Sequence, residues 1–208
     1  MSVCLDQSFY SRPTDLVAKE LLGNRLVRLI ESKENGIERL SGIIVETEAY
    51  GSDDDPASHA YRGLTPRNAV MFGDVGRAYV YFTYGNYFCV NVSARACERK
   101  AGAVLIRALQ PVDGIEVMKS FRKTDNEFSL TSGPGKLTQA MNITKLLNNV
   151  DLTDPKSLLS IEWGFPAPQI VITQRIGITR AVDRKWRYVA GYRKDSCLLI
   201  NKYASRRR

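Results

Sequence analysis

The sequence predicts one domain of the mixed α/β (α+β) class, in which strands joined by tight turns alternate with short helices. Its 208 residues, 44% of them hydrophobic, are enough to bury a full core. Hydrophobic runs bounded by polar turns recur along the chain, which indicates strands. Because the chain has no internal repeat and no clear linker, one domain is favoured over two small ones.

A helix and a hairpin are expected first. Residues 14–22 predict a short helix that ends at Gly23. Two hydrophobic runs, residues 25–30 and 37–50, predict a pair of strands around the polar turn at residues 32–36. The second strand then ends at the rim of the sheet, where a pocket can open.

The end of that second strand carries an unusual polar face. Side chains alternate between the two faces of a strand, so Glu46, Glu48 and Tyr50 share one face. This set suits the wall of a polar pocket better than a core. His59, the only histidine, follows nine residues after Tyr50. A strand-end glutamate is usually solvated or salt-bridged and a lone histidine is usually structural, so this stretch alone does not decide the function.

A loop is expected at residues 51–67 because it contains Gly, Pro and three successive aspartates. The aspartates, at residues 53–55, predict a solvated acidic loop tip rather than a divalent-metal site, because neighbouring loop side chains diverge. Thr65 and Arg67 flank a proline-fixed turn. This turn could contact phosphates or could merely close the loop.

Residues 77–93 predict a second hairpin, with its tight turn near Tyr84. Alternation places Tyr79 and Tyr81 on one face, where ordinary strand packing would also explain them. Tyr84 would stand at the tip, where an aromatic ring can wedge between stacked bases. Asn91 ends an apolar run and needs a hydrogen-bond partner there.

A third buried strand is predicted at residues 103–109, and it contains one charge, Arg107. A buried arginine without an anion is strongly destabilising, and Glu46 or Glu48 would serve as its partner. A structural ion pair and an active-site ion pair both remain open.

The remaining elements are expected to be short. Residues 113–121 predict a helix, and the stretch at 131–136 leads into a further helix at 137–141. That stretch lacks the spacing of a nucleotide-binding phosphate loop, although Lys136 could hold a backbone phosphate. Strands are expected at residues 158–161, 169–173 and 197–200, and a disordered basic tail at residues 204–208.

The charge of the chain is concentrated near its end. Residues 175–208 contain eleven Lys/Arg and two Asp/Glu, a net charge of +9 in a chain of net charge +8. This favours a polyanionic partner, most simply nucleic acid, or else a solvated surface. No signal peptide and no membrane-spanning run of ~20 residues are expected. Four scattered cysteines and one histidine predict reduced thiols and no zinc site.

Several short motifs occur in order along most of the chain. They are E-T-E-A-Y at 46–50, His59, T-P-R-N at 65–68, M-F at 71–72, Y-V-Y-x-x-Y-G-x-Y-F-C-x-N at 79–91, L-I-R-A-L at 105–109 and S-G-P-x-K-L at 132–137. Together they resemble the alkyladenine (3-methyladenine) DNA glycosylase family of the mammalian type, which has bacterial members. The combination is specific, whereas a lone E-T-E-A-Y would not be.

The resemblance implies a single compact domain over residues 1–203, with a curved, mostly antiparallel sheet flanked by short helices and a protruding hairpin that enters DNA. It implies a monomeric, monofunctional base-excision-repair enzyme that needs no metal or cofactor. Its partner would be double-stranded DNA containing damaged purines such as 3-methyladenine, 7-methylguanine, hypoxanthine or etheno-adenine. Without the long N-terminal extension of vertebrate members, a bacterial, nucleoid-associated cytoplasmic protein is expected; a eukaryotic one would be nuclear.

Matching motif positions also carry implied roles at the damaged base. Glu48 would activate a water molecule, and Arg107 would help place that water and Glu48. Tyr50 would stack on one face of the flipped base, with His59 and Tyr81 against the other. The resemblance therefore implies hydrolysis without strand cleavage.

Other matching positions imply selectivity and contacts with DNA. Asn91 would crowd the exocyclic amine of guanine, and Tyr84 would fill the gap left in the duplex. Asn86, beside this wedge, is polar where vertebrate members carry a larger apolar residue. Backbone contacts are implied more weakly, for Thr65, Arg67, Tyr87 and Lys136.

Two other classes of function remain open from the residues. A DNA-binding module without catalysis would keep the Tyr84 wedge and the basic end but would gain nothing from Glu48. A metal-dependent nuclease would use Glu46, Glu48 and the aspartates at 53–55.

Overall fold

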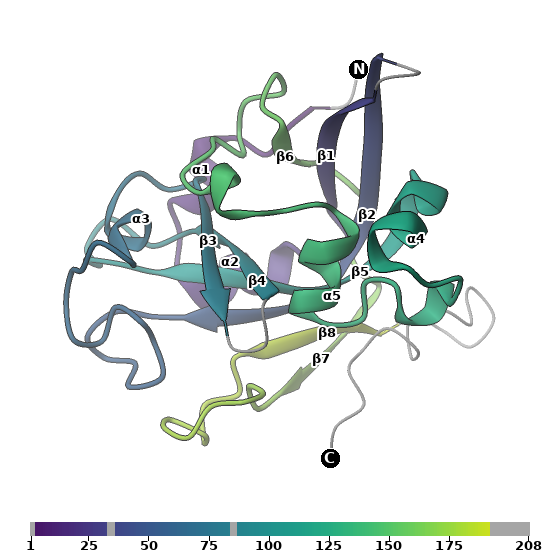
Figure 1. Cartoon of the computed structure of the whole chain (residues 1–208). Helices are drawn as coiled ribbons and strands as arrows, with labels where there is room; N and C mark the ends of the chain where they lie inside the picture. The colour runs from purple at the N-terminus through teal and green to yellow at the C-terminus, as the bar shows by residue number, and fades with distance from the viewer. Residues whose placement is uncertain (1–2, 33–35, 84–86, 192–208) are drawn as a thin grey trace.

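The strand-forming runs of the chain assemble into an eight-stranded sheet, shown in Figure 1 for the computed structural model of the protein. The structure describes residues 3–32, 36–83 and 87–191. The strands are β1 (Arg25–Ser32), β2 (Gly36–Tyr50), β3 (Ala78–Thr83), β4 (Tyr87–Ser93), β5 (Ala103–Asp113), β6 (Leu159–Glu162), β7 (Gln169–Thr173) and β8 (Arg187–Gly191). The helices are α1 (Gln7–Tyr10), α2 (Thr14–Glu20), α3 (Ala69–Phe72), α4 (Ile115–Arg122) and α5 (Pro134–Ala140), with 3-10 turns η1 (Glu127–Ser129) and η2 (Lys145–Leu147).

The long strand β2 organises the sheet. Its first half pairs with β1 and its last residues pair with β8, while β5 runs along its other edge. The main strand order is β3-β4-β5-β2-β1-β6, β7 pairs with β8, and all pairs among the described residues are antiparallel. Register shifts near Ser41 and Glu46 interrupt the β2–β5 pairing. Such bulges bend a strand, and the curved, mostly antiparallel sheet that was predicted is confirmed.

The two faces of β2 have different neighbours. The Thr47 hydroxyl donates to the Ala18 carbonyl of α2 at 2.6 Å, so this face lies against α2. The Tyr50 hydroxyl reaches the Glu48 carboxylate at 2.8 Å on the opposite face. The predicted alternation along this strand is therefore confirmed, and it separates the packing against α2 from the polar groups.

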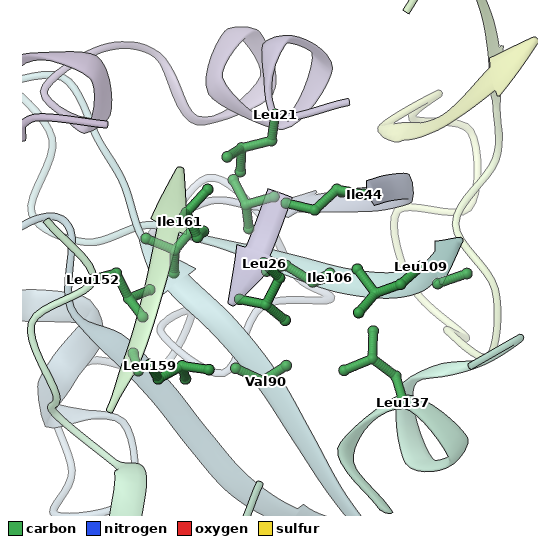
Figure 2. Packing of buried hydrophobic residues seen from close by; sticks show 14 of the residues in the cluster. Leu21, Leu26, Ile44, Val90, Ile106, Leu109, Leu137, Leu152, Leu159 and Ile161 are labelled. Carbon is green, nitrogen blue, oxygen red and sulfur yellow. The ribbon is translucent and has the colours of Figure 1, made fainter. Parts of the chain in front are cut away.

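The core is built from aliphatic side chains of sheet and helices. Figure 2 shows Leu26, Ile44 and Ile106, from three neighbouring strands, packed between Leu21 near the end of α2 and Leu137 of α5. All of these side chains are almost completely buried. Each large aliphatic side chain contributes about 1.5–3 kcal/mol on burial, so this cluster fixes the sheet on which the polar groups stand.

Two predicted helix starts and one strand differ from the structure. The helix predicted at 137–141 begins at Pro134, because proline needs no N–H partner in a first helical turn. The helix predicted from Asp113 begins at Ile115, since Asp113 ends β5 and Gly114 turns the chain with φ +71°. Strand β8 was not predicted at all. The Tyr84 turn, the strand at 197–200 and the basic tail lie outside the described residues.

Two further predictions concern membrane spans and cysteines. No helix within the described ranges is both long and apolar enough to cross a bilayer. Cys4, Cys89 and Cys97 are free thiols, as predicted, whereas Cys197 lies outside those ranges.

Candidate active site

A fully buried carboxylate, Glu48, stands near the end of β2. Its Oε1 accepts the backbone N–H of Ile176 at 2.8 Å. Its Oε2 accepts the Tyr50 hydroxyl at 2.8 Å and Nη1 of Arg107 at 3.3 Å. Because donors reach both oxygens from three segments of the chain, the carboxylate is held in one orientation.

Arg107 of β5 connects two buried glutamates. Its Nε donates to Glu46 Oε1 at 2.8 Å, while Nη1 points to Glu48. Glu46 also accepts Nε of Arg187, on β8, at 2.7 Å. Burial alone would lower the pKa of Arg107, but Glu48 and Glu46 raise it overall. The prediction that a glutamate of β2 partners Arg107 is confirmed, and both glutamates do so.

The Tyr50 phenol acts as a donor. Burial, together with the Glu48 carboxylate, raises the pKa of Tyr50 well above its ordinary value. The hydroxyl therefore stays protonated and donates a hydrogen bond to Glu48. The Arg175 guanidinium lies over the Tyr50 ring at 4.8 Å from its centroid. The part of Tyr50 that Arg175 does not cover lines a pocket.

Aromatic rings of β3 and of the loop after β2 form another wall. The rings of Tyr79 and Tyr81 lie 5.2 Å apart, and His59 meets Tyr81 edge-on at 4.6 Å. The Tyr79 hydroxyl and His59 Nδ1 are 2.9 Å apart. Burial raises the pKa of Tyr79 to about 12. Burial and the charge of Arg67 lower the pKa of His59, which keeps its ring neutral at pH 7.

These groups surround a pocket of about 260 Å³. This volume lies below the ~300–1,000 Å³ of pockets for drug-sized ligands, so it suits one small ring system. Asn91, which is 3% exposed, is fixed in the wall because its Nδ2 donates to the Tyr79 carbonyl at 2.9 Å. This confirms the prediction that Asn91 has a hydrogen-bond partner. Side chains that line the pocket include Tyr50, His59, Tyr79, Tyr81, Cys89, Asn91, Leu105, Arg107, Ile176 and Ile178.

The acidic loop departs from its prediction. Asp55 is completely buried and forms a two-pronged ion pair with Arg175, at 2.6 and 2.8 Å. Its carboxylate also accepts the Gly51 N–H at 3.0 Å. The prediction of a solvated loop tip is wrong for Asp55 because the loop folds back over a buried cation. Asp53 and Asp54 are exposed, as predicted.

The carboxylates of this region are matched to arginines rather than to one another. Within the described ranges, no group of three or more His, Cys, Asp or Glu side chains is arranged to hold a metal ion. Glu46 and Glu48 contact Arg107, and Asp55 contacts Arg175. The nuclease hypothesis therefore gains no support from this geometry.

Comparison with known proteins decides the family. Residues 8–194 match the family described as methylpurine-DNA glycosylase. The chain belongs to that family. It is 49% identical to a protein of Carboxydothermus hydrogenoformans and 47% identical to one of Methanoculleus marisnigri, over 98% of this chain and 99% of each relative. A relative from Rhodopseudomonas palustris is 47% identical over 88% of this chain and 85% of its own length. All three are assigned as 3-methyladenine DNA glycosylases.

Membership makes the chain a DNA glycosylase, an enzyme of DNA repair, and the predicted family is confirmed. The structure places five implied residues of this glycosylase around one pocket: Glu48 just behind it, and Tyr50, Tyr81, Asn91 and Arg107 in its lining. His59 lies at the same pocket with part of its ring exposed.

Three residues that hold buried carboxylates of the glycosylase site were not predicted: Arg175, Ile176 and Arg187. They lie in the segment whose positive charge predicted either a polyanionic partner or a solvated surface. Arg175 and Arg187 are instead largely buried against Asp55 and Glu46. The number of carboxylates near the end of β2 could have predicted these arginines, because several buried acids need more than one cation.

The implied DNA contacts of the glycosylase lie in segments that adjoin the pocket lining, beside the loop of His59 and the start of α5 at Pro134. Thr65 and Arg67 are exposed, and Asn68 fixes their loop by accepting the Thr65 N–H at 2.6 Å. The Arg67 guanidinium lies 5.4 Å from the Tyr81 ring centroid. Tyr87 packs directly over Gly135, whose neighbour Lys136 is exposed. Tyr84 lies outside the described residues.

Proposed function

We propose that this glycosylase rotates a damaged purine out of duplex DNA into the pocket beside Glu48 and hydrolyses its N-glycosidic bond, leaving an abasic site. One observation carries the proposal: a buried carboxylate, held by three donors, stands behind a small aromatic pocket. A base inside a duplex cannot reach such a group, so it must be flipped at a cost of roughly a few kcal/mol. Damaged or mispaired bases are cheaper to flip, which provides a first level of selection.

Glu48 serves as the general base. It takes a proton from a water molecule whose oxygen attacks C1′ of the sugar, while the electrons of the breaking C1′–N bond go to the purine. Its negative charge also stabilises the oxocarbenium-like sugar. Arg107 holds Glu48 and helps to place the water. None of the described residues that line the pocket is a lysine, which supports hydrolysis without a Schiff base or strand cleavage.

Tyr50 stacks on one face of the flipped base, and His59 and Tyr81 lie against the other. A purine nucleotide alkylated at N3 or N7 is positively charged, so it is attracted to these aromatic faces. Candidate substrates are 3-methyladenine, 7-methylguanine, hypoxanthine and etheno-adenine. The fixed amide of Asn91 would crowd the exocyclic amine of guanine and so reject that normal base.

A monomer binds the duplex through the groups around the pocket opening. Tyr84 fills the gap that the flipped base leaves. Exposed groups contact the backbone on either side: Thr65, Arg67, Tyr87 and Lys136. Phosphate contacts of this kind position a protein on DNA without reading its sequence.

The test compares wild type with Glu48→Gln on two duplexes, one with a single hypoxanthine and one randomly methylated, both in chelator. Free base and alkali-labile sites are measured. We expect base release by wild type and a loss of about 10²–10⁴-fold in Glu48→Gln, the range typical of a general base.

Either of two other outcomes would contradict the proposal. Tight duplex binding by both proteins with no base release would favour a DNA-binding module. Strand breaks that appear directly, before alkali, would show a lyase or nuclease activity.

A further inference from the structure

We propose that the Asp55–Arg175 ion pair is a positioning device of this active site: it fixes Glu48 and Tyr50, and its neutrality allows Tyr50 to accept a positively charged base. The inference rests on the proposed function, because it concerns how a purine meets Tyr50.

The pair is rigid. Arg175 Nη1 and Nη2 donate to the two Asp55 oxygens at 2.6 and 2.8 Å, and neither side chain is exposed. Arg175 Nη1 also donates to the Ala49 carbonyl, one residue before Tyr50, at 2.9 Å. A planar guanidinium held at two points by a carboxylate has one orientation. Here that orientation lays it over the Tyr50 ring, 4.8 Å from the centroid.

The same pair determines where the next residue lies. Ile176 follows Arg175 directly, and its N–H donates to Glu48 at 2.8 Å. Gly177 then turns the chain with φ +76°, a conformation that suits glycine. If the Arg175 side chain loses its anchor, this backbone donor loses its fixed position. Misplacement of a reacting group by about 1 Å can reduce a rate about 100-fold.

Asp55 anchors the opposite side of the pocket. It accepts the backbone N–H groups of Gly51 at 3.0 Å and Ala57 at 3.3 Å. Ala57 lines the pocket, as does His59 two residues later. One ion pair therefore connects the Tyr50 platform, the Glu48 carboxylate and the loop that carries His59.

The charge of the pair has a separate consequence. An uncompensated guanidinium on one face of Tyr50 would weaken the attraction of the ring for cations. It would also repel a second cation on the other face. Asp55 cancels that charge at the same place. The neutral pair thus leaves Tyr50 able to attract an alkylated purine, while a neutral purine such as hypoxanthine is little affected.

The experiment measures single-turnover rate constants on two duplexes, one with a single cationic 7-methylguanine and one with a single neutral hypoxanthine. Asp55→Asn keeps the shape of the side chain but leaves Arg175 uncompensated. Asp55→Asn combined with Arg175→Gln removes both charges. Asp54→Asn is the matched control, because it removes the same charge at a neighbouring aspartate that is exposed.

For Asp55→Asn we expect a rate about 10–100-fold lower on both duplexes, and a further loss of about fivefold on 7-methylguanine alone. The double variant should show the same loss of about 10–100-fold on both duplexes, without the additional loss on 7-methylguanine. Asp54→Asn should match wild type on both duplexes.

Equal losses of Asp55→Asn on the two duplexes would overturn the electrostatic part, and wild-type rates would overturn the positioning part. Thermal unfolding shows whether Asp55→Asn folds. If it does not, the neutral double variant tests the positioning role, and a wild-type rate constant for that variant would refute it. Inactive wild type on both duplexes would instead refute the proposed function.

Discussion

The buried wall behind the pocket and the rim around its opening handle charge in opposite ways. In the buried wall, formed by Glu46, Glu48, Arg107 and Arg187, every charged group contacts an opposite charge within 3.3 Å. The rim, formed by Thr65, Arg67, Tyr87 and Lys136, is exposed. Its one cation with a described ring contact, Arg67, meets Tyr81 and a backbone carbonyl.

This difference separates two tasks. Groups in the buried wall cannot move without leaving a charge uncompensated, so they suit chemistry that needs fixed atoms. Rim groups are hydrated and adaptable, so they suit a partner whose phosphates can supply the missing negative charge. Substitutions in the wall should therefore damage stability and rate, whereas rim substitutions should change affinity and salt dependence.

The largest effect is expected for Arg107→Gln. It removes the cation between Glu46 and Glu48, and breaking a buried pair in this way costs about 3–5 kcal/mol. Urea denaturation measures the free energy of unfolding. The control is Arg77→Gln, because Arg77 forms partly exposed ion pairs with Asp74 and Asp151 that are worth at most about 1 kcal/mol. Equal losses in the two variants would remove the distinction between wall and surface.

A smaller effect is expected for Tyr84→Ala, at the proposed wedge. Loss of one base-stacking ring weakens binding by about 1–3 kcal/mol. We expect Tyr84→Ala to bind a duplex containing hypoxanthine more weakly by this amount. Base release from the same strand in single-stranded form should be unchanged. Fluorescence anisotropy and base release measure the two properties. The control is Phe165→Ala, a 90% exposed aromatic between β6 and β7. Equal losses on both substrates would count against the wedge.

Asn91→Ser tests selectivity within the pocket. The shorter side chain makes room for the exocyclic amine of guanine, so release of normal guanine should rise about tenfold, the scale of a small change in pocket size. Mass spectrometry of the released bases provides the measurement. Asn126→Ser, at an exposed asparagine, is the control. An unchanged spectrum of bases would remove Asn91 from this role.

The smallest effect is expected for Lys136→Gln at the rim. If Lys136 contacts one phosphate, the slope of log K against log salt should fall by about 1, with a similar loss of affinity for every sequence. Binding titrations at several salt concentrations measure this slope. Lys156→Gln, three residues before β6 at the far edge of the sheet, should leave the slope unchanged.

Sequence reasoning was most successful where a local rule applied. Alternation along β2 placed Glu48 and Tyr50 on one face, and the cost of a buried charge required a carboxylate for Arg107. Alternation along β3 likewise brought Tyr79 and Tyr81 together. The resemblance supplied the remaining assignments at the pocket, which periodicity alone left open.

The unpredicted part depends on distant pairs. Arg175 meets Asp55 across 120 residues and Arg187 meets Glu46 across 141 residues. No local pattern specifies such pairs, and a count of charge over a segment treats buried and exposed arginines alike. Strand β8 was missed in the same basic segment, and it pairs with β2, which is far away in the sequence.

These separations affect how the protein is made. During synthesis Glu46 and Asp55 leave the ribosome long before Arg187 and Arg175, which follow them by 141 and 120 residues. At ~5–20 residues per second the delay is roughly 6–30 s. Until then Asp55 lacks Arg175 and Glu46 lacks Arg187, although Arg107 is already present, so the wall behind Glu48 is incomplete. A nascent chain can therefore complete the site that releases the base only near the end of translation.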